Sequence, residues 1–382
     1  MLAALREETP LFFEERLERW FVTRHADVRA CLRDRRLGRN FRHIGSEDEF
    51  DAAEPLHPRW QAFWDTERWS LLWLEPPEHT RIRKLVAAAF TPRSVDALRG
   101  PCAELARELL PEGRFDLLRG FAQPYSIAVI CRLLGVPTDR GRDLLDWSHA
   151  MVKMYELDTT EAQAEAATAA AAEFRDYVVS LIEERRRDPR DDLVTRLVEA
   201  RVEGERLSDA QIVSTIIVLL NAGHEATVNT LGNGVLALLH HSEQWERLVP
   251  GEVEPAAAVE ELIRWDPPLQ LFERWVLEED VEIAGRPVPR GAKVALLFGS
   301  ANRDPRAFEN ADAFDVGRAN AAEHIGFGGG IHVCIGAPLA RIELEAALRA
   351  LVEGAPGLEL AEEPRRNRAF VIWGLDRLEL CA

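Results

Sequence analysis

The feature that most constrains this chain is a glycine-rich segment that carries a single cysteine to the start of a helix. Residues 327–336 read Phe-Gly-Gly-Gly-Ile-His-Val-Cys-Ile-Gly, and an amphipathic helical pattern follows through Val352. Glycines allow tight turns and close approach to a flat partner, and Pro338 suits a first helical turn. The free amides and dipole of a helix start favour a thiolate over a thiol. We therefore expect Cys334 to bind a metal, although a lone Cys-x-Gly is more typical of a buried structural cysteine.

Most of the remaining chain has the pattern of helices. Apolar residues recur every three or four positions, with Ala, Leu, Glu and Arg between them. Helices are predicted over residues 80–90, 102–110, 160–187 and 209–240. Strands are predicted at 20–23 and within 281–298, with a turn at 285–287. Residues 266–330 are rich in Pro, Gly, Asp and Asn and are expected to form a long irregular stretch. The prediction is one mainly α domain with small β-sheets, spanning residues 1–382.

Composition argues against nucleic-acid binding, membrane anchoring and a framework of disulfide bonds. The chain has 47 basic and 65 acidic residues, a net charge of −18, which disfavours nucleic acid and anionic membranes as partners. The five cysteines are scattered and odd in number, so neither a disulfide framework nor a zinc site is indicated. The first ten residues carry charges, and the longest strongly apolar run, 212–220, is too short to cross a bilayer. We expect a cytoplasmic protein that is neither exported nor anchored.

The cysteine loop resembles the haem-binding signature of the cytochrome P450 family, in the form common among soluble bacterial members. Three further segments follow the family's order: Glu-Leu-Ile-Arg at 261–264, Pro-Pro-Glu-His-Thr-Arg-Ile-Arg at 76–83, and Ala-Asn-Arg-Asp-Pro at 301–305 with Phe-Asp at 314–315. Taken alone, the first is an ordinary ion pair and the second a capped surface helix. Taken together, they resemble the P450 fold, in which haem lies between the long central helix and the helix after the cysteine loop.

The resemblance implies haem b (iron protoporphyrin IX) as cofactor, with Cys334 as the ligand of its iron. It places Phe327 and Gly336 in the haem loop, and it assigns the haem propionates to His79, Arg83, Arg274 and His332. The physical reason is independent of the resemblance, because two buried carboxylates need cationic or hydrogen-bonding partners.

The resemblance also implies a structural role for Glu261 and Arg264, together with a third residue. Many relatives have an arginine where this chain has Ala313. Arg318 is the candidate for that third position.

The long helix departs from the family pattern. Residues 222–227 read Ala-Gly-His-Glu-Ala-Thr, against Ala/Gly-Gly-x-Asp/Glu-Thr-Thr/Ser in the family. Gly223 permits a local widening of the helix. Glu225 matches the acid of the family's acid–alcohol pair, and a carboxylate in an apolar helix needs a task or a partner, here proton delivery. Ala226 stands where the alcohol is expected, and Thr227 points about 100° around the helix.

Three accounts of the missing hydroxyl stay open. Thr227 substitutes for it through a distorted helix, an ordered water does, or a polar group on the substrate does. Relatives with the same loss are thought to use the substrate, which favours a mostly apolar small molecule with an oxygen function near the reacting carbon. The resemblance implies a pocket that is largely apolar and is lined by Trp69, Leu72, Val218, Asn221, Ala222, Ala226, Leu269, Phe272, Val371 and Ile372.

The function implied is that of a monooxygenase, which inserts one oxygen atom from O2 into its substrate, typical of bacterial secondary metabolism. There are two alternatives: a peroxide-driven peroxygenase, whose known members tend to have Arg-Pro at the acid–alcohol position, and a haem-thiolate sensor without turnover, which would not need Glu225. With no flavin or ferredoxin domain in the sequence, we expect a separate ferredoxin and ferredoxin reductase to supply electrons from NAD(P)H. An acidic ferredoxin would dock on the cysteine side, near Arg341.

Overall fold

The structure is a computed structural model that describes residues 2–46, 50 and 58–382. The four predicted helices are confirmed, with ends that agree to within three residues. The α-helices of the described residues are α1 (Leu2–Glu8), α2 (His25–Arg33), α3 (Gln61–Glu67), α4 (Glu78–Ala89), α5 (Pro92–Asp96), α6 (Arg99–Leu109), α7 (Gln123–Leu134), α8 (Gly141–Val152), α9 (Glu161–Arg187), α10 (Leu193–Glu199), α11 (Asp209–His240), α12 (Ser242–Leu248), α13 (Pro255–Trp265), α14 (Phe298–Ala301) and α15 (Ala337–Gly354). Shorter 3-10 turns and one π-helical segment, Leu117–Ala122, join them.

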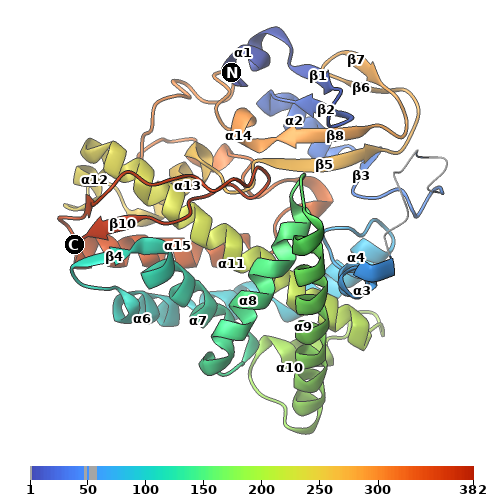
Figure 1. Cartoon of the computed structure of the whole chain (residues 1–382), viewed down its shortest axis with the longest axis horizontal. Helices are drawn as coiled ribbons and strands as arrows, with labels where there is room; N and C mark the ends of the chain where they lie inside the picture. The colour runs from blue at the N-terminus through green and yellow to red at the C-terminus, as the bar shows by residue number, and fades with distance from the viewer. Residues whose placement is uncertain (1, 47–49, 51–57) are drawn as a thin grey trace.

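The strands form a five-stranded, a three-stranded and a two-stranded sheet. Their bounds are β1 (Leu11–Glu14), β2 (Arg19–Val22), β3 (Leu37–Gly38), β4 (Arg114–Asp116), β5 (Leu271–Val276), β6 (Val281–Ile283), β7 (Arg286–Val288), β8 (Lys293–Leu297), β9 (Glu359–Leu360) and β10 (Glu379–Cys381). The largest sheet has the order β1-β2-β8-β5-β3, in which β2 and β8 are parallel and the other pairs antiparallel. It lies with α1 and α2 at one end of the molecule, away from α6 to α10 (Figure 1).

The strands predicted within residues 281–298 are present as β6, β7 and β8, whereas β5 lies in residues 266–280, where the sequence predicts no strand. The sequence of β5, Leu-Phe-Glu-Arg-Trp-Val, places two adjacent charged residues in the middle of the strand, which hides the usual alternation. In the structure the partly exposed Glu273 pairs with Arg19, and Arg274 is buried. Chain without regular strands or long helices does follow, from Asn302 to the cysteine loop.

The helix α11 runs through the centre of the helical part and is buried on nearly every side. Ser208 begins it with a capping box, in which the Ser208 hydroxyl accepts from the Gln211 amide and the Gln211 side chain accepts from the Ser208 amide. Gly234 lets α13 approach closely, because a Cβ there would lie 2.6 Å from Leu262 Cδ1. The predicted widening at Gly223 is wrong for this structure, since α11 is a continuous α-helix over its whole length. Among the described helices, none is both long and apolar enough to cross a membrane.

Candidate functional site

The cysteine loop is held in shape by its backbone. Gly328 and Gly330 have φ angles of +68° and +64°, which favour glycine, and a Cβ on Gly330 would clash with the carbonyl oxygen of Leu32 in α2. The Cys334 amide donates to the Phe327 carbonyl at 2.9 Å and closes the loop. Three residues further on, α15 begins at Ala337 with Pro338 in its first turn. The loop therefore presents Cys334 at a helix start, as the sequence predicts.

The Cys334 thiol has a mixed environment. Loss of hydration raises its pKa, while backbone amides of Gly336 and Ala337 act in the opposite direction by hydrogen bonding to the sulfur. The net direction is opposite to the expected preference for the thiolate, because desolvation outweighs the helix start. The residue nevertheless has exposed surface. A bound cation would supply the positive charge that converts this thiol into a ligand.

Two predicted propionate residues have buried polar atoms with no hydrogen-bond partner among the described residues. They are His79 Nε2, in α4, and Arg274 Nη2, in β5. Burial lowers the pKa of His79 to about 4 and that of Arg274 to about 9. Unpaired buried donors are costly, so these atoms fit the carboxylates of the implied haem.

The other two predicted propionate residues already have partners. Arg83 donates to the Val333 carbonyl at 2.7 Å. The ring of His332 lies 4.5 Å from that of His79, and its Nε2 is 3.0 Å from a carboxylate oxygen of Glu75. Sequence reasoning missed Glu75, although it directly precedes the 76–83 motif. The structure thus gathers all four predicted residues beside the cysteine loop and adds a carboxylate that orients His332.

The Glu-x-x-Arg pair forms a buried network behind the loop. Arg264 donates to both carboxylate oxygens of Glu261, at 2.6 and 2.7 Å, and both side chains are fully buried. Its remaining donors reach the carbonyls of Asn302, Ala311 and Ala313. Arg318 Nε lies 3.2 Å from the same carboxylate, so the structure places it as the third member. Such a network fixes the irregular chain before the loop, because each buried charge is paired.

A mostly apolar cavity of about 170 Å³ lies between α11, β5 and the segment around Val371. Of the predicted pocket residues, the structure brings together Leu72, Asn221, Ala222, Ala226, Leu269, Phe272, Val371 and Ile372. Trp69 and Val218 do not line it. Trp69 packs against the main core instead, and Val218 lies in the part of α11 that precedes the cavity.

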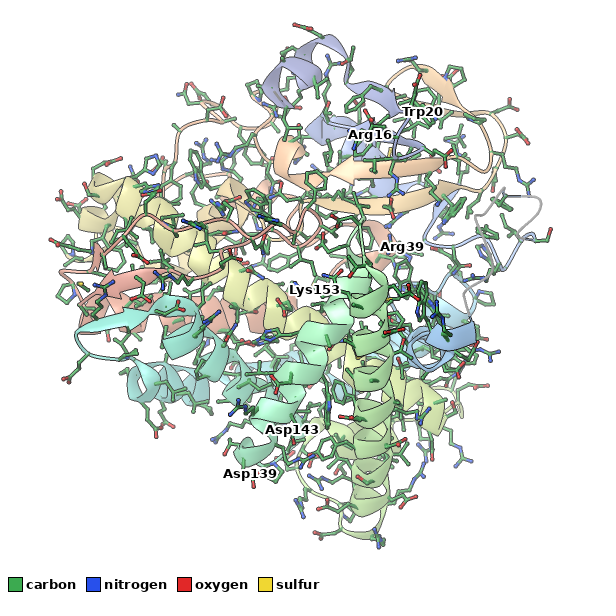
Figure 2. The ribbon with its side chains drawn as sticks, viewed as in Figure 1. Arg16, Trp20, Arg39, Asp139, Asp143 and Lys153 are labelled. Carbon is green, nitrogen blue, oxygen red and sulfur yellow. The ribbon has the colours of Figure 1, made fainter. Side chains whose placement is uncertain are left out.

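Two of the polar side chains that line the cavity are Asn221 and Arg39, and the sequence predicts only the first. Asn221 was predicted, and its Oδ1 is buried without a hydrogen-bond partner in the described part of the chain. Arg39 was missed. It follows β3 and lies where the sheet meets the helices (Figure 2), stacked between Trp73 and Phe272 at 4.4 and 4.0 Å. The Arg39 side chain donates to the carbonyls of Leu72 and Glu273. No local motif marks this position.

The residues at and next to the acid–alcohol position line two different cavities. Glu225 and Ala226 line the large cavity, whereas Thr227 lines a smaller one beside Gly336 and Glu343. Burial raises the pKa of Glu225. Its carboxylate lies 3.2 Å from His149 Nε2, and 3.4 Å from the side-chain amide of Asn229. Sequence reasoning missed His149, which comes from α8.

Comparisons with known proteins agree with this geometry. A family model described as Cytochrome P450 matches residues 144–250 and 256–354. The chain is 37% identical over 378 residues to "Polyketide biosynthesis cytochrome P450 PksS" of Bacillus subtilis (strain 168), covering 95% of this chain and 90% of that protein. It is 36% identical to "Vitamin D(3) 25-hydroxylase" of Pseudonocardia autotrophica, covering 94% and 87%. The solved structure of P450BioI in complex with a hexadec-9Z-enoic acid ligated acyl carrier protein covers 100% of this chain and 96% of that one, with a TM-score of 0.91 and 31% identity.

Proposed function

The chain belongs to the cytochrome P450 family, and from that premise we propose that it oxygenates a mostly apolar small molecule with an oxygen function near the reacting carbon. The general class is a haem-thiolate monooxygenase with iron protoporphyrin IX as cofactor. One observation carries the finer proposal: an apolar cavity contains both Ala226, in place of the family's alcohol, and the Oδ1 of Asn221, which has no hydrogen-bond partner among the described residues.

In this proposal the haem is held from two directions. Cys334 would ligate the iron through its sulfur, supported by the amides of Gly336 and Ala337. His79 and Arg274, whose buried donors lack partners in the described residues, would bind the propionates, with Arg83 and His332 beside them. When bound, this cofactor supplies the redox chemistry that activates dioxygen.

The cavity supports the proposed substrate class. Its walls are mainly Leu, Val, Ile, Phe and Ala side chains, which favour an apolar body. The Oδ1 of Asn221 would accept a hydrogen bond from a substrate hydroxyl and so satisfy a costly buried acceptor. The names of three relatives refer to polyketide biosynthesis, a steroid and vitamin D3. Polyketides, steroids and vitamin D3 all combine an apolar body with oxygen functions.

Glu225 is the proposed proton donor. It lines the cavity next to Ala226, and burial raises the pKa of its carboxyl, which makes the protonated form more accessible near neutral pH. The contacts with His149 and Asn229 hold the carboxylate at the cavity wall. These two contacts also give the Glu225 carboxylate the partners that a buried charge needs. Its burial alone therefore does not require a catalytic role, contrary to the expectation from the sequence.

Electrons would come from a separate ferredoxin and its NAD(P)H-dependent reductase, in the cytoplasm. The proposed docking face is the cysteine-loop side, where Val333 is exposed. Arg341 lies there but forms a bidentate pair with Glu260, at 2.6 and 3.0 Å. Its contribution to binding an acidic ferredoxin is therefore smaller than that of a free cation.

The test is a titration of the ferric, haem-loaded protein with pairs of apolar compounds that differ by one hydroxyl, followed by the Soret band. The hydroxylated member should shift the band at roughly tenfold lower concentration, the cost of one unsatisfied buried acceptor. In Asn221→Ala, which removes that acceptor, the gap between the pair should close. Equal binding of both members to the wild-type protein would contradict the proposal.

A further inference from the structure

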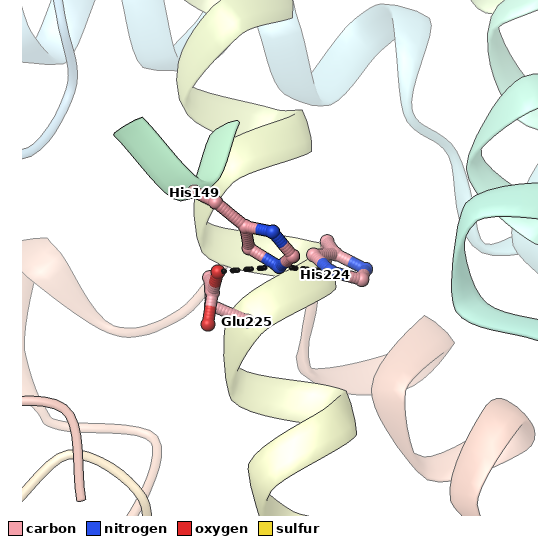
Figure 3. A group of neighbouring side chains, drawn as sticks. All are labelled: His149, His224 and Glu225. Atoms are coloured by element: carbon pink, nitrogen blue, oxygen red, sulfur yellow. Dashed lines mark hydrogen bonds and ion pairs between the residues drawn. The ribbon is translucent and has the colours of Figure 1, made fainter. Parts of the chain in front are cut away.

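Three side chains outside the family's haem-binding motifs meet where α8 crosses α11. They are His149 of α8 and His224 and Glu225 of α11 (Figure 3). One potential ligand atom from each lies within 4.8 Å of the other two. We propose that this cluster is a binding site for a divalent zinc ion, beyond the proposed monooxygenase function.

The distances match those of a zinc site. Zinc bonds to histidine nitrogen and carboxylate oxygen are about 2.0–2.1 Å, so neighbouring ligand atoms of a tetrahedral site lie about 3.3–3.4 Å apart. In the structure, His149 Nε2 lies 3.2 Å from Glu225 Oε1 and 3.4 Å from His224 Nε2. Two of the three distances between the ligand atoms therefore already match those of a tetrahedral zinc site.

Hydrogen bonds alone satisfy this cluster poorly. His149 Nε2 faces both the Glu225 carboxylate and His224 Nε2, and it carries either one hydrogen or one lone pair, so it completes only one of the two hydrogen bonds. A metal ion would instead use one lone pair from each of the three groups.

The ligand types and their surroundings favour zinc over calcium or magnesium. Two imidazole nitrogens and one carboxylate are typical of zinc, whereas the harder cations prefer oxygen ligands. The His149 side chain is 38% exposed, so an ion can reach the cluster from solvent, and water can fill a fourth position. His224 Nδ1 has no partner in the described residues, and a missing outer partner costs about 10–100-fold in affinity. We therefore expect micromolar rather than nanomolar binding.

A bound ion would join two helices at the edge of the substrate cavity. It would fix α8 against α11 and occupy the Glu225 carboxylate. If Glu225 delivers protons, as in the proposed function, zinc at micromolar concentration would inhibit turnover.

The test is calorimetric titration of the haem-loaded protein with zinc chloride. We expect one saturable site per chain at micromolar affinity, weakened at least about 10–100-fold in His149→Ala, because losing a ligand costs at least as much as losing an outer partner. His149 is partly exposed, so this substitution spares the core. The matched control is His240→Ala: His240 Nε2 also lies 3.2 Å from a carboxylate, that of Glu363, but without a second histidine ligand, and its loss should leave the site unchanged.

Two results would overturn the proposal: no saturable zinc binding by the wild-type protein, or equal affinity in wild-type and His149→Ala. The spectrum of the carbon-monoxide complex separates this failure from failure of the haem assignment. Absent zinc binding in a protein with a thiolate-type spectrum rejects the zinc site alone. Zinc binding in a protein without that spectrum rejects only the haem assignment.

Discussion

The two sides of the proposed haem site differ in how tightly the fold constrains them. On the cysteine side, the backbone conformation restricts which residues can occupy the loop. Gly328 and Gly330 have positive φ, and any side chain on Gly330 would clash with α2. On the α11 side, Glu225, Ala226 and their neighbours face a cavity. A side chain there can change without moving the backbone. The comparison explains why the family pattern is intact around Cys334 and altered at Ala226.

The largest expected effect is on the network that braces the cysteine side. Glu261→Gln should lower the free energy of unfolding by about 3–5 kcal/mol, because it leaves the fully buried Arg264 without its counter-charge. Urea unfolding measures this. The control is Asp143→Asn, in a solvent-exposed pair with Arg140 at the same sequence separation, which should cost no more than about 1 kcal/mol. Similar losses in both variants would show that the network does not hold the loop.

On the cavity side, Glu225→Gln should leave haem content and stability nearly unchanged and lower product formation roughly 100-fold, the lower end for a lost general acid. Product formed per haem measures the effect. Glu273→Gln is the matched control, since Glu273 also lines the cavity but pairs with Arg19. Undiminished turnover in Glu225→Gln would assign proton delivery to another group.

The smallest effects concern the missing alcohol. Ala226→Thr should improve coupling with deoxygenated substrate analogues about two- to tenfold, the worth of one hydrogen bond, and do little for the native substrate. Thr227→Ala should change little, because Thr227 lines a different cavity. Peroxide released per NAD(P)H consumed measures both. Uncoupling of every substrate in Thr227→Ala would make Thr227 the working alcohol, and equal coupling in all proteins would leave an ordered water.

Sequence reasoning succeeded where the signal is local. The apolar pattern predicts the bounds of α11, and the glycines of the cysteine loop predict its turns. It failed where distant segments meet. Arg39 reaches the cavity wall from the segment after β3, and His149 reaches Glu225 from α8, and no spacing links either residue to α11. The widening expected at Gly223 is not seen, because α11 stays an α-helix through this glycine even where it borders the cavity.

The central claim is that Cys334 holds haem iron as a thiolate. The most direct measurement is the absorption spectrum of the reduced carbon-monoxide complex. The account predicts the red-shifted band characteristic of thiolate ligation in the intact protein, its loss in Cys334→Ala, and its retention in Cys381→Ala, which removes the other exposed cysteine. A spectrum typical of histidine ligation in the intact protein would contradict the account.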